Sequence, residues 1–377
     1  MIPIWKLKRE LGRLGEETAA RLANLYEPIL RKRHDAWRDR QPTPQDLGIG
    51  PRPKIAIFLI YQPKGVAPSI LATLSWLAAN GYAPLVVSNT PLSGTDRARL
   101  APLAWRVFER PNFGYDFGGY RDGVLLLQRW GITPERLLIL NDSVWMPTRP
   151  DSSLIARLEA VPADVVGGIE HPASTKRYGG THRGHLESYL LLVNARACAS
   201  DAFGAFWRDY PSSSKRLNAI RRGERQFASR MRDAGLTAQG LFSRQAFLDG
   251  LAQQETSFLQ KTLTYASYVE PELAAEGVQL LESDANDQTW RDRVIQHIAR
   301  TTIRRRFNAG FCYPSDALFG MDFIKKSPGP TGGGSGASLH SRMRRKHLEA
   351  VRAGDLAPLG AEVMAEIMAR EDRSGSA

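Results

Sequence analysis

Short, continuous apolar runs separated by helix-length segments constrain the fold of this chain most strongly. The clearest run, residues 55–61, lies between Pro53 and Pro63. Strands that are buried on both faces of a parallel sheet have this composition, because helices cover both faces of such a sheet. Further candidate strands are residues 85–88, 105–108, 137–140, 165–166 and 189–193, and helix-like segments such as 69–79 separate them. This alternation predicts an α/β fold with a doubly wound, mostly parallel sheet.

The two ends of the chain differ from this middle part. Leu and Ile recur at steps of three and four over residues 4–30, with Lys and Arg off the stripe, which predicts a basic amphipathic helix. A Pro- and Gly-rich stretch follows it, a Gly-rich stretch occupies 329–336, and a helical pattern covers 339–370. We therefore predict three parts: a helical extension and linker (1–50), a central domain (51–328), and a flexible linker with a helical tail (329–377).

The formal net charge of +12 is concentrated near the ends of the chain. Residues 1–54 hold 12 basic and 7 acidic side chains and residues 291–350 hold 12 and 4, whereas residues 55–290 hold 24 and 23. A basic surplus indicates an anionic partner. A sequence-specific nucleic-acid binder needs a basic face on its folded body, so the neutral central part argues against that class.

The basic helix over residues 4–30 has two interpretations. It packs on its own domain or on a partner helix, or it lies on an anionic membrane surface. No run of about 18 apolar residues is present, and the first residues lack the order of a secretory signal. We therefore expect a cytoplasmic protein that is peripheral on the inner face of the plasma membrane if its basic ends bind lipid.

Polar residues follow two of the predicted strands directly. Tyr61 ends the first run, and Asn141, Asp142 and Ser143 follow the run at 137–140. Ligands of doubly wound sheets bind outside the carboxyl ends of the strands. There, Asp142 could share a Mg²⁺ or Mn²⁺ ion with a diphosphate. The alternative is a structural role for Asp142 as a helix cap or in a turn.

A glycine-rich segment with aromatic residues follows the strand at 105–108. It contains Asn112, Gly114 and Asp116, and further glycines at 118, 119 and 123. These glycines allow a ligand to approach the backbone, or they allow a helix to pack tightly on the sheet. Their spacing fits neither the dinucleotide fingerprint nor the phosphate loop.

Together, residues 112–120, 141–144 and 185–193 resemble the rhamnan synthesis protein F family of bacterial glycosyltransferases. Segments 203–207, 224–235, 313–315 and 323–326 resemble further family segments in the same order, so the resemblance covers roughly residues 54–328. It implies a GT-A-like fold and a deoxythymidine diphosphate rhamnose (dTDP-rhamnose) donor. It also implies an α-rhamnosyl product in a cell-surface polysaccharide such as O-antigen, capsule or rhamnan, built on a lipid-linked glycan acceptor.

An α-linked product from a β-linked donor requires inversion, hence a base for the acceptor hydroxyl and stabilisation of the leaving diphosphate. The candidate bases are Glu224, His185 and Glu187. Neighbouring arginines at 221, 222 and 225 predict an ion pair for Glu224. For the diphosphate, the candidates are Asp142 with a metal ion, or cations such as Lys325.

Two other functions stay open at this point. The chain could transfer a sugar from a different nucleotide donor, such as a fucose or hexose donor. It could also be a family member that binds glycans without turnover. Donor hydrolysis or transfer would separate the enzyme from the binding protein.

Overall fold

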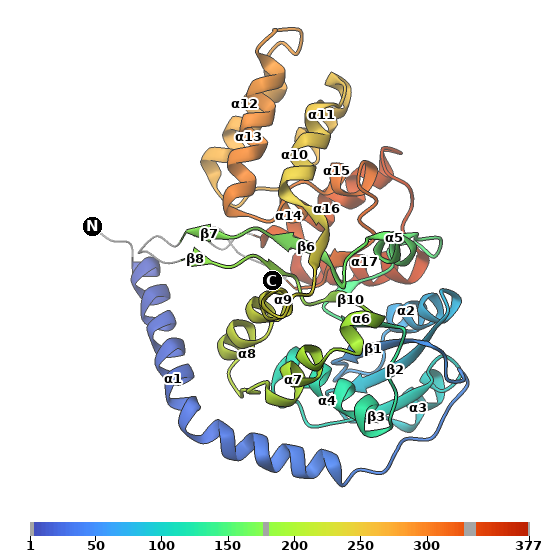
Figure 1. Cartoon of the computed structure of the whole chain (residues 1–377). Helices are drawn as coiled ribbons and strands as arrows, with labels where there is room; N and C mark the ends of the chain where they lie inside the picture. Colours follow the sequence, from blue (N-terminus) through green and yellow to red (C-terminus); the bar gives the residue numbers. More distant parts are fainter. Residues whose placement is uncertain (1–3, 176–180, 328–336, 376–377) are drawn as a thin grey trace. The chain divides into compact units, whose positions relative to one another are not determined.

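The structure is a computed structural model, and it describes residues 4–175, 181–327 and 337–375 (Figure 1). The chain forms two compact units. Unit 1 comprises residues 1–142 and 155–241, and unit 2 comprises residues 143–154 and 242–377. The predicted Gly-rich linker at 329–336 lies outside the described residues.

Unit 1 contains the main sheet and the helices around it. Its helices are α1 (Ile4–Asp39), α2 (Pro68–Ala79), α3 (Gly94–Leu100), α4 (Tyr115–Arg129), α6 (Ala195–Cys198), α7 (Asp201–Asp209), α8 (Arg216–Arg222) and α9 (Glu224–Asp233). Its strands are β1 (Lys54–Ile60), β2 (Tyr82–Ser88), β3 (Arg106–Glu109), β4 (Arg136–Asn141), β6 (Val165–His171), β7 (Ser174–Thr175), β8 (Thr181–His182), β9 (His185–Leu186) and β10 (Leu190–Asn194). Helix α5 (Leu154–Ala160) and strand β11 (Ala238–Ser243) cross the boundary between the units.

Unit 2 is mainly helical. It contains the strands β5 (Val144–Trp145) and β12 (Ile324–Lys325) and the helices α10 (Arg244–Ala252), α11 (Thr256–Thr264), α12 (Pro271–Glu282), α13 (Trp290–Arg304), α14 (Phe307–Gly310), α15 (Cys312–Ala317), α16 (Leu339–Arg352) and α17 (Ala361–Gly375).

The main sheet has the order β11-β6-β10-β4-β1-β2-β3, with β9 beside β6. Strand β1 is parallel to β2 and β4, and β2 is parallel to β3. Strand β10 runs antiparallel to β4 and β6. Helices alternate with the parallel strands along the chain, so the structure confirms the α/β class with a mostly parallel sheet that the apolar runs predict.

The direction of strand addition reverses beside β1. Strands β2 and β3 are added on one side of β1, and β4 is added on the other side. Right-handed crossovers therefore place α4 on the opposite face of the sheet from α2 and α3. The carboxyl ends of β1 and β4 lie next to each other at this reversal, which is where ligands bind in doubly wound sheets.

Glycines allow α4 to lie close against β1. A Cβ atom on Gly123 would be 2.8 Å from Ile57 Cγ2, and one on Gly119 would overlap Leu59. Gly114 adopts a left-handed conformation (φ +85°) at the N-terminal end of the helix, a conformation that glycine reaches without strain. Of the two interpretations of this segment, packing on the sheet therefore accounts for Gly119 and Gly123.

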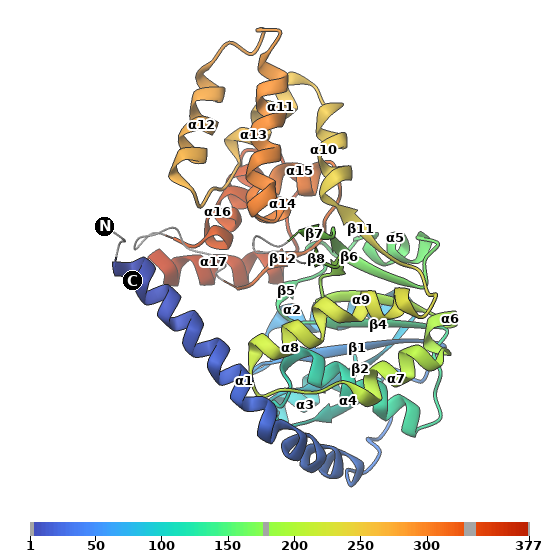
Figure 2. The same ribbon diagram turned by 60° about the vertical axis from the view of Figure 1, so that its left-hand side comes forward.

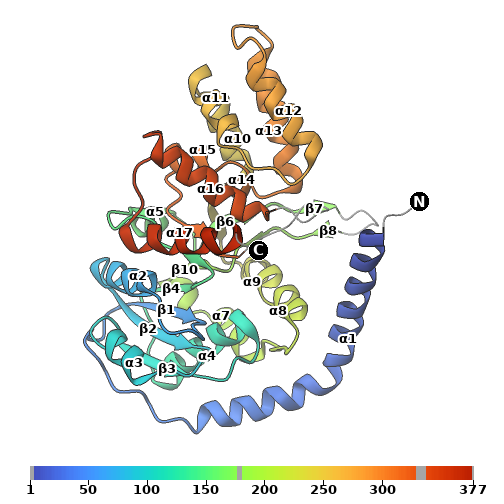
Figure 3. The ribbon, with the colours of Figure 1, turned by 180° about the vertical axis from the view of Figure 1, so that it is seen from behind.

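Helix α1 packs on the rest of unit 1 through its polar side. Asn218 of α8 donates to the Ala20 carbonyl, and Arg222 Nη1 lies 2.8 Å from Glu27 Oε2. Figure 2 shows α1 and α8 side by side. Pro28 lies inside α1, and Figure 3 shows that the helix changes direction about midway, as expected where proline removes a backbone hydrogen bond.

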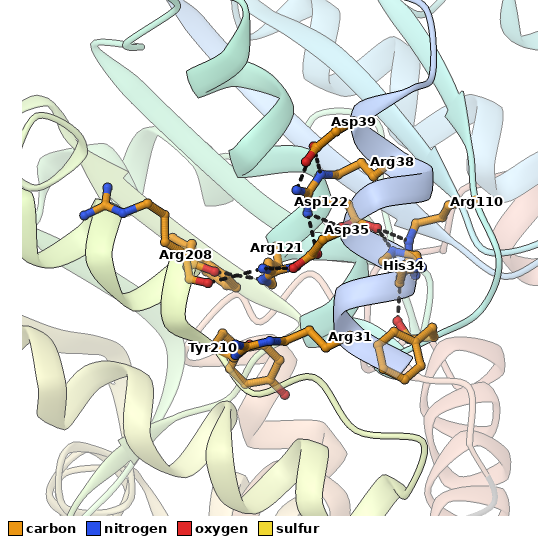
Figure 4. Close-up of polar contacts among 12 residues, drawn as sticks. Arg31, His34, Asp35, Arg38, Asp39, Arg110, Arg121, Asp122, Arg208 and Tyr210 are labelled. Carbon is orange, nitrogen blue, oxygen red and sulfur yellow. Dashed lines mark hydrogen bonds and ion pairs between the residues drawn. The ribbon is translucent and has the colours of Figure 1, made fainter. Parts of the chain in front are cut away.

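The C-terminal part of α1 completes a buried charge network on α4 (Figure 4). Asp122 is fully buried and lies 2.6 Å from both Arg110 Nε and His34 Nε2, and 3.3 Å from Arg38 Nη1. Arg110 also donates to the Phe113 carbonyl. The network therefore fixes the loop that leads into α4, and α1 is part of its support.

Unit 2 is built around Trp145 and the last two helices. Leu348 of α16 and Ile367 of α17 belong to the same buried cluster as Trp145 and Ile324. Trp145 Nε1 donates to Glu366 at 2.7 Å. The C-terminal helices thus share a core with residues 143–154, which are nearly two hundred positions earlier in the sequence.

These compact units differ from the division at residues 50 and 328 that composition suggests. Proline- and glycine-rich segments indicate where regular secondary structure stops, but they do not indicate which side chains on either side of them are in contact. Assignment of the central part, 51–328, to a transferase domain stays a prediction. No helix in the described part of the chain is both long and apolar enough to cross a bilayer.

Candidate functional site

Asp142 joins the ends of β1 and β4. Its Oδ2 accepts hydrogen bonds from the Tyr61 backbone N–H at 2.8 Å and from Gln62 Nε2 at 2.5 Å. Its own backbone N–H donates to the Leu59 carbonyl at 3.1 Å. A carboxylate is therefore held at the point where the strand order reverses, with the half-exposed Tyr61 side chain beside it.

Asp116, in the first turn of α4, extends this group of polar side chains. Asn141 Nδ2 donates to Asp116 Oδ2 at 3.1 Å. Tyr120, one turn further along α4, is buried, and its hydroxyl donates to the Ser188 carbonyl at 2.8 Å. Burial raises the pKa of Tyr120, and the negative charges of Asp116, Glu224 and Asp142 raise it further. The Tyr120 hydroxyl is therefore held by Ser188 within the electrostatic influence of three carboxylates.

Glu224 lies at the N-terminus of α9 and shares Ser188 as a hydrogen-bond partner with Tyr120. Its Oε2 accepts from the Ser188 hydroxyl at 2.6 Å and from the Ser188 backbone N–H at 3.4 Å. Two of the three neighbouring arginines expected to pair with it have other partners: Arg221 pairs with Glu17, and Arg222 pairs with Glu27. A negative charge at a helix N-terminus is stabilised by the helix dipole, so the fold supports the Glu224 carboxylate by other means than these arginines.

Two stacked histidines lie beside Glu224. The rings of His185 and His171 are 4.8 Å apart, and His185 Nε2 is 4.0 Å from Glu224 Oε1. His171 Nε2 lies 2.8 Å from Oε1 of the buried Glu187. Burial, and then the charge of His171, lower the pKa of His185 to about 4. His185 is therefore neutral at pH 7 and holds a lone pair on its ring.

The structure thus brings most of the predicted site residues together within unit 1. The contacts form linked pairs: Tyr61 with Asp142, Asn141 with Asp116, and His185 with Glu224, while Glu187 contacts His171, which stacks on His185. Gly114 lies at the start of the helix that carries Asp116, and Asn112 is exposed in the preceding loop.

Two predicted donor-binding residues belong to unit 2. Lys325 lies opposite Val144 in the β5–β12 ladder, and the Lys326 backbone N–H donates to the Ser143 carbonyl at 3.0 Å. Ser143 and Lys325 are therefore held together by one short antiparallel pair. Their part in donor binding stays a prediction.

Sequence reasoning missed four residues that hold the site together: Gln62, Tyr120, His171 and Ser188. Gln62 comes directly after Tyr61, so the rule that ligands bind at the carboxyl ends of strands would have found it. Ser188 and Tyr120 stand within the segments that carry the family resemblance. No sequence signal predicts that the His171 ring stacks on His185.

Among the described residues, Asp142 is the side chain predicted to hold a metal ion. Within residues 4–175, 181–327 and 337–375, no three His, Cys, Asp or Glu side chains are grouped as metal ligands. Mg²⁺ is commonly held by one or two carboxylates together with substrate phosphates. The part of Asp142 in such an arrangement stays a prediction.

Comparison with solved structures finds similarity to two transferases at low sequence identity. A mannosyltransferase from Pyrobaculum calidifontis, solved with GDP-Man and Mn²⁺, is 11% identical, with 81% of this chain and 90% of that chain covered and a TM-score of 0.32. A putative nucleotide-diphospho-sugar transferase from Desulfovibrio desulfuricans G20 is 14% identical, with 51% and 81% covered and a TM-score of 0.29.

Comparison of sequences identifies the family. The family model described as Rhamnan synthesis protein F matches residues 85–270. The uncharacterized protein y4gN of Sinorhizobium fredii (strain NBRC 101917 / NGR234) is 31% identical over 275 residues, which are 70% of this chain and 68% of that protein. The matched region contains Asp116, Asp142 and Glu224 of the site described above. This chain belongs to the rhamnan synthesis protein F family.

Proposed function

We propose that the protein is an inverting glycosyltransferase that moves L-rhamnose from dTDP-rhamnose to a growing cell-surface polysaccharide. The observation that carries the proposal is the group of carboxylates at the reversal of strand order, where Asp142 is held between β1 and β4. Membership of the rhamnan synthesis protein F family supports the GT-A-like assignment and the choice of rhamnose.

Asp142, Asp116 and Asn141 form the donor side of the proposed site. The leaving diphosphate develops negative charge, so it needs cations or hydrogen-bond donors near it. A Mg²⁺ or Mn²⁺ ion bound by Asp142 and the diphosphate would neutralise that charge. Tyr61 and the loop with Asn112 and Gly114 border the strand ends and would contact the nucleoside.

Glu224 is the base that we propose for the acceptor hydroxyl. Its Oε2 is engaged by Ser188, whereas the 4.0 Å from Oε1 to His185 Nε2 is longer than a hydrogen bond. Oε1 can therefore accept the hydroxyl proton while the neutral His185 places no positive charge against it. Glu187 would act through His171, by fixing the ring that stacks on His185.

The acceptor would be a lipid-linked glycan at the cytoplasmic face of the plasma membrane. The excess of basic over acidic side chains near both ends of the chain would attract the protein to anionic lipid, at about 1 kcal/mol per basic residue near the surface. No specific nucleic-acid partner is proposed.

A panel of nucleotide sugars tests donor choice by thermal shift. A ligand that binds only the folded protein adds about 2.7 kcal/mol of stability at one hundred times its dissociation constant. We expect dTDP-rhamnose with Mg²⁺ or Mn²⁺ to raise Tm more than UDP-, GDP- or other dTDP-sugars, and Asp142→Asn to reduce this rise. Asp209→Asn, which changes an exposed carboxylate on α7, is the matched control.

Each outcome of the panel has one meaning. A larger shift with a different nucleotide sugar would replace rhamnose with that sugar and keep the transferase class. A shift without any transfer or donor hydrolysis would identify a binding protein that lacks turnover. No shift with any nucleotide sugar would contradict the donor site.

A further inference from the structure

The apolar stripe of α1 faces solvent in the part of the helix whose side chains the structure describes. Leu22 is 58% exposed, Leu25 is 78% exposed and Ile29 is 58% exposed, and Tyr26 beside them is 41% exposed. Buried helix residues in globular proteins normally come from the apolar face. Here the buried residues of the same stretch are Ala20, Ala23 and Glu27.

Three acidic side chains of α1 pair with other elements of unit 1. Glu17 and Glu27 pair with Arg221 and Arg222 of α8. Asp35 receives two hydrogen bonds from Arg121 of α4. Glu17, Glu27 and Asp35 are therefore neutralised by ion pairs with other helices of unit 1.

Three cations of the same stretch lie on the other side, whereas Arg31 donates to the Asp209 and Tyr210 carbonyls and Arg38 pairs with the buried Asp122. Arg21, Lys32 and Arg33 are exposed and lie within one helical turn of the apolar row at either end. A row of Leu, Tyr and Ile flanked by exposed Lys and Arg is the pattern of helices that lie in the interface of an anionic bilayer. The sequence continues the stripe toward the N-terminus at the same helical spacing, with Ile4, Leu7, Leu11 and Leu14.

We propose that the face of α1 formed by Leu22, Leu25, Tyr26 and Ile29, with Arg21, Lys32 and Arg33, is a docking surface for anionic phospholipid. The opposite side of α1 is anchored to α8 and α4, so docking needs no release of this helix from unit 1. The inference rests on the exposure and charge of α1 alone, and it does not depend on the proposed transferase activity.

The contacts of α1 with unit 1 also determine which variants can test the docking surface without unfolding the protein. His34 and Arg38 pair with the buried Asp122, so deletion of the N-terminal segment would remove part of a buried charge network. Point substitutions on the exposed row avoid this because those side chains make little packing contact. The full chain carrying Leu22→Ser, Leu25→Ser and Ile29→Ser should keep its Tm.

Vesicle sedimentation measures the docking surface directly. The wild-type chain should bind vesicles of phosphatidylglycerol and phosphatidylethanolamine and not vesicles of phosphatidylcholine. The triple serine variant should bind at least about tenfold more weakly, since three apolar side chains lose their burial. The affinity of the variant Arg21→Gln, Lys32→Gln, Arg33→Gln for anionic vesicles should fall about fivefold for each cation removed.

The matched control removes exposed aliphatic side chains elsewhere. Val278, Leu281 and Ile303 of unit 2 are 52%, 37% and 71% exposed, and their joint change to serine should leave vesicle binding unchanged. Wild-type binding that the α1 variants retain would overturn the proposal, as would no binding of the wild type to anionic vesicles. A wild-type dimer that the serine variant loses, without vesicle binding, would instead assign the face to a second copy of the chain.

Discussion

Asp142→Asn is expected to lower the rate of sugar transfer by about 10²–10³-fold, the usual effect of removing a group that stabilises charge in a transition state. Asparagine has nearly the same shape, and its oxygen can still accept from the Tyr61 backbone N–H, which now donates to Asp142 at 2.8 Å. The fold should therefore be kept while the negative charge is lost. Release of dTDP from dTDP-rhamnose in the presence of acceptor measures this rate.

Two comparisons make this prediction specific to the site. Asp209→Asn changes an exposed carboxylate on α7 and should leave the rate within about twofold, since surface substitutions usually have small effects. The Tm of both variants should stay close to that of the wild type. Full turnover of folded Asp142→Asn would remove Asp142 from the leaving-group role.

Asp122→Asn is expected to lower the free energy of unfolding by about 3–5 kcal/mol, because it breaks a buried ion pair by removing one partner. The Arg110 side chain is fully buried and lies 2.6 Å from Asp122. Without the carboxylate, the Arg110 charge would stay buried without a carboxylate partner, and Arg38 would lose one of its three. Urea unfolding monitored by circular dichroism measures the change.

A surface carboxylate in the same network supplies the control. Asp39 pairs with Arg38, but its side chain is 58% exposed, so Asp39→Asn should cost at most about 1 kcal/mol. A loss below about 1 kcal/mol for Asp122→Asn would show that the network contributes little to stability.

The effect of Asp122 should also depend on pH. Burial alone raises the pKa of this carboxyl. The interactions with Arg110, His34 and Arg38 lower it by more than burial raises it, so the pKa of Asp122 is below its ordinary value. A depressed carboxyl pKa stabilises the fold above the pKa of the unfolded state, about 3.9 for Asp, and this contribution is lost as pH falls below it. The difference between wild type and Asp122→Asn should therefore narrow below about pH 4.

The sheet could be predicted because its signal is local. Residues 55–60 and 137–140 are continuous apolar runs and are buried in β1 and β4. The rule that ligands bind at strand ends predicted Tyr61 and Asp142 as site residues without knowledge of strand order, and the structure places them in contact. Pairing of β10 antiparallel to β4, which brings Ser188 and Glu224 to the same edge, depends on contacts between distant segments that a pattern in one segment does not encode.

The orientation of α1 shows a limit of periodicity. The spacing of Leu22, Leu25 and Ile29 defines one face of a helix, but it does not determine whether protein, lipid or water covers that face. Arg221 and Arg222, about two hundred residues away, pair with the acidic side of α1 and so turn that side toward unit 1. Because Arg221 and Arg222 pair with α1, they do not form with Glu224 the ion pair that their closeness in sequence suggests.

The boundaries of the compact units depend on contacts between distant segments. The Pro- and Gly-rich stretches predict helical extensions at both ends of the chain, and this division stays a prediction. His34 contacts Asp122 in unit 1, and Glu366 binds Trp145 in unit 2. Each contact joins segments separated by tens to hundreds of positions, so only the folded chain reveals it.

The central claim is sugar transfer from a nucleotide diphosphate donor at the site around Asp142. The most direct measurement incubates the full chain with dTDP-rhamnose, Mg²⁺ or Mn²⁺ and a rhamnose-primed lipid acceptor, and follows dTDP release and the anomeric configuration of the product by NMR. We predict release of dTDP with formation of an α-rhamnosyl linkage, and strong loss of both in Asp142→Asn. Absence of both hydrolysis and transfer with every nucleotide sugar tested, by a protein shown to be folded, would contradict the account.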